Sequence, residues 1–197
     1  MTGIFSIEAN WRKDGTEPSA EPMLAMVAKH HGAKLKHRVA GTRDEFWKHL
    51  LAWDKQDKHF CFVHLWLHGS RGSVSVGSSD IGLVDILDSH SHHPYDWKNC
   101  VVHFGACSTM DAERSDLREF LNRTELSAIS GYEIDVDWIE PLALESMYLG
   151  FLLELLANRT AGATPNDMRI VRDKLTNSEM TAGLCRALRF KMMIAGD

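Results

Sequence analysis

The chain has 197 residues, a length that predicts one domain with its own hydrophobic core. Hydrophobic residues make up 44% and charged residues 25%, which is typical of a globular protein and excludes a disordered chain. The net charge of -5 disfavours nucleic-acid binding, and no apolar run reaches the ~18 residues of a membrane span or has the pattern of a signal peptide. We therefore expect a single cytoplasmic domain over residues 1–197 that binds neither nucleic acid nor a membrane.

The first half of the chain alternates short apolar runs with amphipathic segments. In chain order it predicts a strand at 4–9, a loop at 10–22, a helix at 23–31 ended by Gly32, an edge strand at 34–39, a helix at 42–54 opened by a capping box, and a strand at 60–67. The last of these is apolar at nearly every position, which indicates a strand buried on both faces.

The second half continues the same alternation. Up to residue 104 it predicts a turn at 70–73, a short strand at 74–76, a short helix at 82–87, a polar, histidine-rich loop at 89–96 and a buried strand at 101–104. Beyond that it predicts a helix at 116–122, a strand at 126–130 stopped by Gly131 and a buried helix from Asp137 to Leu156. The last elements are a helix with Thr164 as cap and Pro165 at its first position, and a final strand at 189–194. This order predicts an α/β fold: a three-layer α/β/α sandwich around a mostly parallel sheet.

The four cysteines show no C-x-x-C spacing, so a disulfide framework is not expected and reduced thiols are. Cys61, Cys100 and Cys185 lie in or beside apolar segments, where a cysteine acts as a small buried hydrophobe. Cys107 differs, because it follows the end of a predicted strand.

Two of the predicted buried strands end in reactive side chains. His68 and Gly69 follow the strand at 60–67, and Cys107 follows the strand at 101–104 by way of Gly105 and Ala106. Ligand sites of open parallel sheets form beyond the carboxyl ends of the strands, so neighbouring strands would bring His68 and Cys107 together. A thiolate is a strong nucleophile, and an imidazole can take its proton and later protonate a leaving amine. The backbone N–H groups of Gly69 and Cys107 would then bind an oxyanion.

The segments HLWLHGSRG, VVHFGACST and SGYEIDVDW resemble the caspase-like (clan CD) cysteine peptidases, and among them the bacterial CHAT group related to caspases and separase. The resemblance covers residues 4 to 156, and 39 positions separate His68 from Cys107, near the ~50 of caspases. It implies a caspase-like fold, a Cys–His dyad without an essential third member, and cleavage of peptide bonds. Bacterial relatives often act in regulated cell death or antiviral defence. The caspase pentapeptide begins Gln-Ala-Cys and ends in Gly, whereas Gly105 and Ser108-Thr109 flank Ala106-Cys107 here, so aspartate specificity does not carry over.

In CHAT and separase relatives, a tract after the next strand shapes the pocket for the residue that precedes the cut. Residues 131–138 occupy that place and contain Asp135 and Asp137. An acidic wall would favour arginine or lysine by charge pairing. Asp137 could equally cap the helix that follows. Trp138, next to it, is the tryptophan most worth attention.

Two other classes of function remain open from the sequence. The first is a catalytically silent caspase-like scaffold that binds peptides or partner proteins. The second is a zinc-dependent hydrolase, since imidazole and thiolate suit zinc and the chain has 11 histidines. His64 and His68 share one strand face but lie about 13 Å apart by strand rise, too far to bind one ion together. His90, His92 and His93 fall in the predicted polar loop, and His103 follows nearby.

We therefore expect no metal and no cofactor. The expected partner is a protein or peptide substrate, such as a neighbouring effector protein, and the oligomeric state stays open. The charged tract 111–119, just past Cys107, is expected to be a solvated loop and helix face, with a substrate lid as its alternative.

Overall fold

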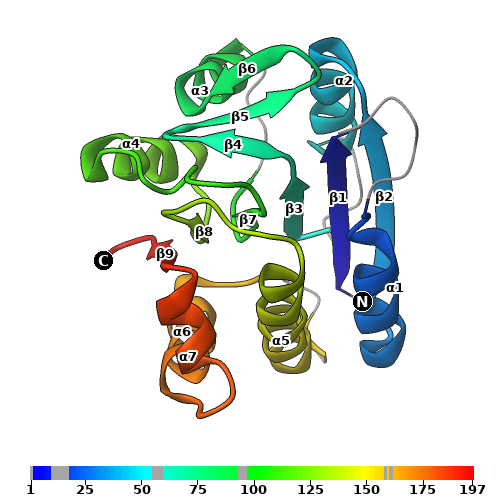
Figure 1. The fold of residues 1–197 in the computed structure, drawn as a ribbon, viewed down its shortest axis with the longest axis vertical. Coiled ribbons are helices and arrows are strands. Elements are labelled where there is room, and N and C mark those ends of the chain that lie inside the picture. Colours follow the sequence, from blue (N-terminus) through cyan, green and yellow to red (C-terminus); the bar gives the residue numbers. More distant parts are fainter. Residues whose placement is uncertain (1, 10–17, 55–59, 93–96, 158, 160–161) are drawn as a thin grey trace.

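Six strands form the central sheet of the computed structural model, which describes residues 2–9, 18–54, 60–92, 97–157, 159 and 162–197 (Figure 1). In spatial order they are β2 (Lys34–Ala40), β1 (Gly3–Ala9), β3 (Phe62–Trp66), β7 (Val101–Phe104), β8 (Ala128–Tyr132) and β9 (Phe190–Ile194). The first five are mutually parallel, and β9 pairs antiparallel with β8. The sequence prediction of a mostly parallel sheet is confirmed.

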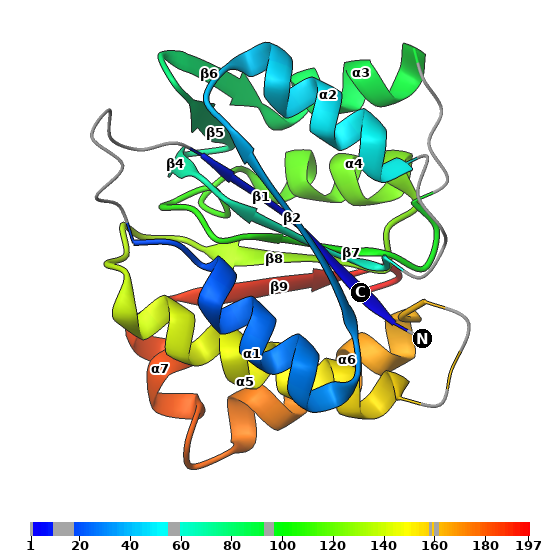
Figure 2. The ribbon, with the colours of Figure 1, turned by 90° about the vertical axis from the view of Figure 1, so that its right-hand side faces the viewer.

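Helices cover both faces of this sheet, as Figure 2 shows in an edge-on view. One layer contains α1 (Glu21–His31), α5 (Ile139–Leu156), α6 (Pro165–Asn177) and α7 (Ala182–Ala187). The other contains α2 (Arg43–Asp54), α3 (Leu83–His92) and α4 (Arg114–Thr124). The arrangement confirms the three-layer α/β/α fold class.

A second, smaller sheet follows β3 directly. It consists of β4 (His68–Ser70), β5 (Ser73–Val76) and β6 (Ser79–Gly82), which pair antiparallel in that order. Figure 1 shows it at the arrowhead end of β3, next to α3. The first residue of this small sheet is therefore the candidate catalytic histidine, His68.

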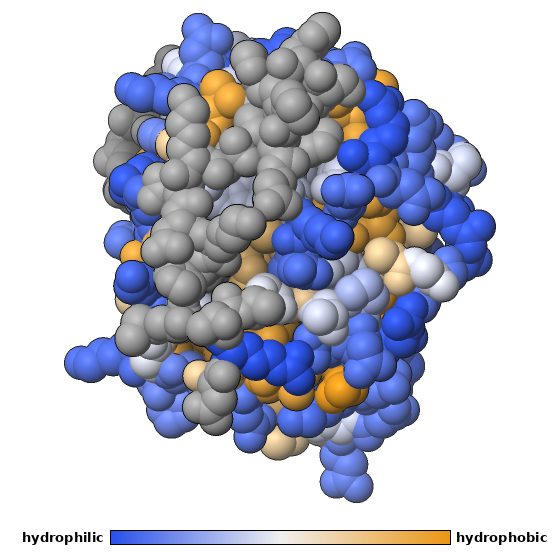
Figure 3. Space-filling view, turned by 180° about the vertical axis from the view of Figure 1, so that it is seen from behind, coloured by the Kyte–Doolittle hydropathy of each residue, from blue (hydrophilic) through white to orange (hydrophobic). Residues whose placement is uncertain are grey.

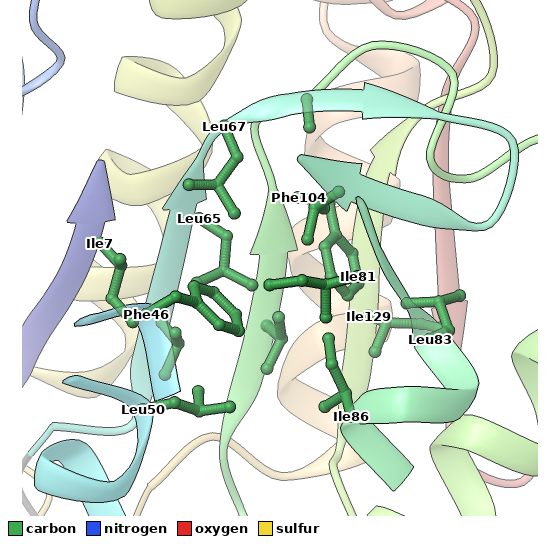
Figure 4. Close-up of a cluster of buried hydrophobic side chains, with 14 of the residues drawn as sticks. Ile7, Phe46, Leu50, Leu65, Leu67, Ile81, Leu83, Ile86, Phe104 and Ile129 are labelled. Carbon is green, nitrogen blue, oxygen red and sulfur yellow. The ribbon is translucent and has the colours of Figure 1, made fainter. Parts of the chain in front are cut away.

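The two faces of β3 explain why its sequence is apolar at every position except His64. Val63, Leu65 and Leu67 join the core beneath α2 and α3, part of which Figure 4 shows. Phe62 and Trp66, which alternate with them, join the core on the α1 and α5 side. Alternate residues of a strand point to opposite faces, so a strand covered on both faces needs apolar side chains at both sets of positions.

The surface and two helix ends match what the sequence predicts. The described part of the face in Figure 3 is mainly hydrophilic with small apolar patches. Among the residues placed by the structure, none of the helices has the length and apolar character needed to cross a bilayer. Gly32 ends α1 in the left-handed conformation at φ 64°, and Thr164 forms a capping box with Asp167 at the start of α6, both as the sequence predicts.

Several predicted boundaries are wrong. The helix expected at 82–87 continues as α3 to His92, so the loop expected from residue 89 is helical at its start, and residues 93–96 lie outside the described chain. The strand β8 continues through Gly131 because that residue pairs with Phe104 on one side and Lys191 on the other. Of the loop expected at 10–22, residues 10–17 are not described, and α1 already begins at Glu21.

The start of α5 also differs from the prediction. The helix begins at Ile139 with Trp138 as its N-cap residue, and Asp137 lies one position before the cap. The Asp137 Oδ1 atom accepts a hydrogen bond of 2.7 Å from the backbone N–H of Trp138. Asp137 therefore lies at the exposed entrance to the helix without capping its first turn.

Candidate active site

The two strands that precede the candidate dyad are neighbours in the central sheet. β3 pairs parallel with β7, and His64 is the register partner of His103. His68 and Cys107 each follow this register pair by four residues, so both leave the sheet at the same carboxyl edge. The chain passes from β1 outward to β2 and then returns to β3 on the other side of β1, so the strand order reverses between β1 and β3. Ligands bind in open α/β sheets at such a reversal, beyond the carboxyl ends of the strands.

The turns after β3 and β7 are packed against each other. A Cβ atom on Gly69 would lie 2.3 Å from the carbonyl oxygen of Cys107 and 2.5 Å from the Oγ1 atom of Thr109. Any side chain at position 69 would therefore separate the two turns. The glycine after His68 is what allows the backbone beside the histidine to touch the backbone of the cysteine.

Cys107 is half-buried beside the segment that follows β8. Its Sγ atom donates to the carbonyl oxygen of Val136 at 3.5 Å and accepts from the N–H of Val136 at 3.4 Å. The next residue, Ser108, has a left-handed backbone with φ 51°. Its N–H donates to the carbonyl of Ile134 and its hydroxyl to Asp135 Oδ1, at 3.0 and 2.8 Å. These bonds hold an otherwise unfavourable conformation directly after the thiol.

A small cavity of about 150 Å³ opens at this place. Its lining comes from the ends of β3 and β7 and from the segment before α5: Trp66, Leu67, His68, Gly105, Ala106, Cys107, Val136, Asp137 and Trp138. Cavities for drug-sized ligands are at least about 300 Å³, so this one suits a single side chain. The rings of Trp66 and Trp138 lie with their centroids 5.5 Å apart in its wall.

The structure separates the two candidate pocket aspartates. Asp137 lines the cavity together with His68 and Cys107. Asp135 is not among the lining residues, and its carboxylate instead accepts the hydrogen bond from Ser108. Gly69 is not among the lining residues either, but it approaches the backbone of Cys107 closely.

Larger cavities lie elsewhere. One of about 470 Å³ lies beside Arg71, Leu83 and Asp116, and one of about 550 Å³ lies between α1 and α5. Their linings, as far as the chain is described, contain neither His68 nor Cys107. The smallest of these three cavities is the candidate active site, because the cysteine and the histidine that the sequence singles out both line it.

A buried polar cluster beneath the site was missed by the sequence reasoning. Glu145 of α5 bridges two imidazoles: its carboxylate is 2.9 Å from His64 Nε2 and 2.9 Å from His103 Nε2. The hydroxyl of Tyr132 donates to the same carboxylate at 2.9 Å. All four side chains are at most 1% exposed. We call His64, His103, Tyr132 and Glu145 the Glu145 network.

Electrostatics hold the Glu145 network together. Burial raises the pKa of Glu145, but the attraction and hydrogen bonds of His103 and His64 outweigh it and lower that pKa from 4.5 to about 2. Burial lowers the pKa of His103, with Glu145 opposing the shift. Burial, together with the neighbouring charge of Glu145, raises the pKa of Tyr132 well above 10.

Residues of the Glu145 network also have the chemistry of metal ligands. The ligand atoms of His64, His103 and Glu145 lie within 4.8 Å of one another. However, both imidazoles are already satisfied by hydrogen bonds, because their Nδ1 atoms face Ser6 and Ser130 at 3.5 and 3.0 Å. Hydrogen bonds alone therefore account for the cluster.

One family model covers nearly the whole chain, that of the family of unknown function DUF6642, which matches residues 2–193. The chain belongs to the DUF6642 family. No curated protein matches it in sequence. Among solved structures, this DUF6642 protein is similar to caspase-1 from Spodoptera frugiperda, with a TM-score of 0.52 and 15% identity over 98% of this chain and 87% of that chain. The Drosophila initiator caspase Dronc has a TM-score of 0.47 and 13% identity over 92% and 75% of the two chains.

The match to caspase-1 shows the fold of this DUF6642 protein, and at 15% identity it shows no more than the fold. The predicted caspase-like architecture is confirmed. Membership of the CHAT group within it rests on the sequence resemblance alone, because the matching family model is one of unknown function.

Proposed function

We propose that this protein is a caspase-like cysteine endopeptidase in which Cys107 is the nucleophile and His68 the general base and acid. One observation carries the proposal: His68 and Cys107, from the ends of two adjacent parallel strands, line the same small cavity. The fold in which they do so is similar to that of caspase-1 from Spodoptera frugiperda.

The geometry supports a two-step reaction. Cys107 gives its proton to His68 while the sulfur attacks the scissile carbonyl carbon, and a C–S bond forms as the carbonyl oxygen becomes an oxyanion. His68 then protonates the leaving amine and the C–N bond breaks. Water attacks the acyl-enzyme, His68 accepts the proton of that water, and the C–S bond breaks to release the carboxylic acid product and restore the thiol.

The oxyanion is assigned to the backbone N–H groups of Gly69 and Cys107. The contact between Gly69 and the Cys107 backbone brings these two peptide units together without an intervening side chain. Paired backbone donors of this kind are worth several kcal/mol in the transition states of other acyl-transfer enzymes.

The pocket favours a basic side chain before the cut. Asp137 supplies a carboxylate at its rim, and Trp66 and Trp138 supply aromatic faces on which a guanidinium or ammonium group can pack. Asp135, the other candidate from the sequence, is assigned instead to holding Ser108 after the nucleophile.

The test is selective labelling of Cys107. Peptidyl acyloxymethyl ketones with Arg, Lys, Leu, Phe or Asp before the warhead are incubated with the protein, and the labelled cysteine is found by mass spectrometry. Cys100 is the internal control, since it is half-buried like Cys107 but lies outside the cavity. We expect a label on Cys107 alone, fastest with Arg or Lys. An inert Cys107, or equal labelling of Cys100, contradicts the proposal and favours the non-catalytic scaffold.

Specificity gives a further prediction. Asp137→Asn should lower kcat/KM for an arginyl peptide by about tenfold, because the ion pair is lost while the shape of the pocket is kept. The value for a matching leucyl peptide should stay within about twofold of wild type. Asp135→Asn is the control and should leave the ratio of the two rates unchanged. The reverse result, with the ratio altered only by Asp135→Asn, would move the specificity role to Asp135.

The biological setting is also a proposal. The CHAT resemblance supports a neighbouring effector protein as the substrate, in the cytoplasm, in a bacterial defence or cell-death pathway. The substrate can be found by mapping new protein termini in cells that contain the wild-type chain and comparing them with cells that contain a Cys107→Ala chain.

A further inference from the structure

The Glu145 network joins four elements at a point directly below the dyad. His64 lies on β3, His103 on β7, Tyr132 on β8 and Glu145 on α5. The two imidazoles are register partners on adjacent strands, and the carboxylate contacts one with each of its oxygens. A single side chain thus ties β3 to β7 across the sheet face.

The residues that Glu145 contacts on β3 and β7 lie close in sequence to both catalytic candidates. Glu145 contacts β3 and β7 four residues before His68 and four residues before Cys107. β3 continues for only two residues beyond His64 and β7 for one beyond His103, so the network lies at the carboxyl ends of both strands, where the segments that carry His68 and Cys107 begin. Gly105 is the point of direct contact: a Cβ there would lie 3.3 Å from both Glu145 Oε1 and His64 Nε2. The turn that carries Cys107 therefore rests on the network itself.

The network also fixes the segment that forms the pocket wall. Tyr132 ends β8, Glu145 lies in the second turn of α5, and their 2.9 Å hydrogen bond joins the two ends of the intervening segment 133–138. That segment contains the residue bonded to Cys107 Sγ, Val136, and the pocket residues Asp137 and Trp138.

A second path leads from the network to the pocket through aromatic rings. The His64 ring stacks on Trp66 with centroids 5.7 Å apart and an interplanar angle of 15°. Trp66 in turn packs on Trp138 in the cavity wall. A change in the position of His64 would thus reach the pocket without passing through Tyr132.

Stability alone does not explain a carboxylate at position 145. Apart from Tyr148, the other buried residues of α5 are apolar, among them Leu144, Leu149 and Leu152. Replacing a buried charged cluster with apolar side chains of similar volume is often neutral or stabilising, because the desolvation cost of the charges is removed. A hydrogen-bonded cluster differs from an apolar one in that it accepts only one relative position of its members.

We propose that Glu145 is a positioning residue for the dyad and the pocket. Through His64 and His103 it sets the offset between the strands that carry His68 and Cys107. Through Tyr132 it holds segment 133–138 against the thiol. The catalytic consequence rests on the proposed protease function, whereas the structural consequence does not.

The first arm of the test is hydrogen exchange, which needs no activity. Tyr132→Phe removes one hydroxyl, and Glu145→Gln keeps the volume but removes the charge. Asp167→Asn is the matched control, because Asp167 is an equally buried carboxylate, ion-paired with Arg159 in the first turn of α6. We expect exchange in segments 104–110 and 133–138 to become about tenfold faster in the two network variants, with segment 165–177 unchanged, and the reverse pattern in Asp167→Asn.

The second arm is kinetic and uses the acyloxymethyl ketone that labels the wild type fastest. Glu145→Gln should lower the maximal inactivation rate by about tenfold, because the reacting groups are displaced. Tyr132→Phe should raise the concentration needed for half-maximal rate, because only the pocket segment is released. Asp167→Asn should leave both constants within about twofold at temperatures where it is folded.

Three results would overturn the inference. In the two network variants, these are a uniform rise in hydrogen exchange over the whole chain, or unchanged exchange in segments 104–110 and 133–138. The third is stoichiometric zinc in the purified wild-type protein, since a metal would replace the hydrogen bonds. A wild type that no ketone labels would instead contradict the protease function, and the exchange pattern would still decide the role of Glu145.

Discussion

Alanine at position 107 is expected to lower the rate of peptide hydrolysis by at least about 10³-fold, because no other described thiol lies at the cavity. Alanine at position 68 should cause a loss of similar size, since His68 is the one imidazole among the described residues that line the cavity and so the proposed acceptor of the thiol proton. The two residues act as a unit, so the double variant should be hardly less active than either single one. Hydrolysis of an arginyl peptide by the three variants measures this directly.

Controls for this experiment are available in the same chain. Cys100→Ala and Cys185→Ala remove one half-buried and one buried thiol away from the cavity and should keep the wild-type rate. Strictly additive losses for Cys107→Ala and His68→Ala would show that the two side chains act independently, against a dyad. Undiminished hydrolysis by Cys107→Ala would exclude this cysteine as the nucleophile.

The sequence predicts that His68 and Cys107 lie together because its signals are local. A buried strand followed by His-Gly and another followed by Gly-Ala-Cys can each be recognised within nine residues, and the α/β order implies that their ends share one edge. The contact between Gly69 and Cys107 is the physical reason for the glycine in the first of these patterns.

The Glu145 network escaped prediction because its members are far apart in the chain. Glu145 lies 81 residues from His64 and 42 from His103, and only the strand order and register bring them together. Sequence reasoning compared His64 with His68 along one strand, whereas the partner of His64 lies across the sheet. The available signal was chemical: two histidines in strands that should be wholly apolar, and a glutamate in a helix buried on nearly all sides.

Element boundaries failed where tertiary pairing outweighed local preference. Gly131 reads as a strand breaker, yet β8 has hydrogen-bonded neighbours on both sides there and continues to Tyr132. The cap signal at Asp137 is one position early, because Asp135, Val136 and Asp137 belong to the segment that passes Cys107 and the cavity. The same residues that disturb the helix start thus form the candidate pocket.

Removing one member of the Glu145 network should destabilise the protein strongly, even though replacing the whole network with apolar side chains need not. Glu145→Ala leaves two buried imidazoles without their acceptor and should lower the free energy of unfolding by about 3–5 kcal/mol. Domains of this kind have roughly 5–15 kcal/mol in total, so the variant should be close to unfolding. Glu154→Ala on the same helix is the control: that residue is exposed and pairs with Lys174, so it should cost less than about 1 kcal/mol. Urea titrations of both variants give the comparison, and equal midpoints for the two would contradict the expected role of Glu145.

The lowered pKa of Glu145 also predicts how the free energy of unfolding depends on pH. The pKa of Glu145 is lowered to about 2 in the folded protein, against 4.5 for an ordinary glutamate, so the unfolded chain binds its proton first as the pH falls. The stability that Glu145 contributes is therefore complete above about pH 4.5 and declines toward pH 2. Glu145→Gln removes this carboxyl and also its opposition to the lowering of the His103 pKa, so the comparison is made below about pH 4.5, where the carboxyl itself titrates. The difference in unfolding free energy between wild type and Glu145→Gln should shrink as the pH falls from about 4.5 toward 2; a difference that grows over this range would mean that the carboxyl is protonated in the folded protein.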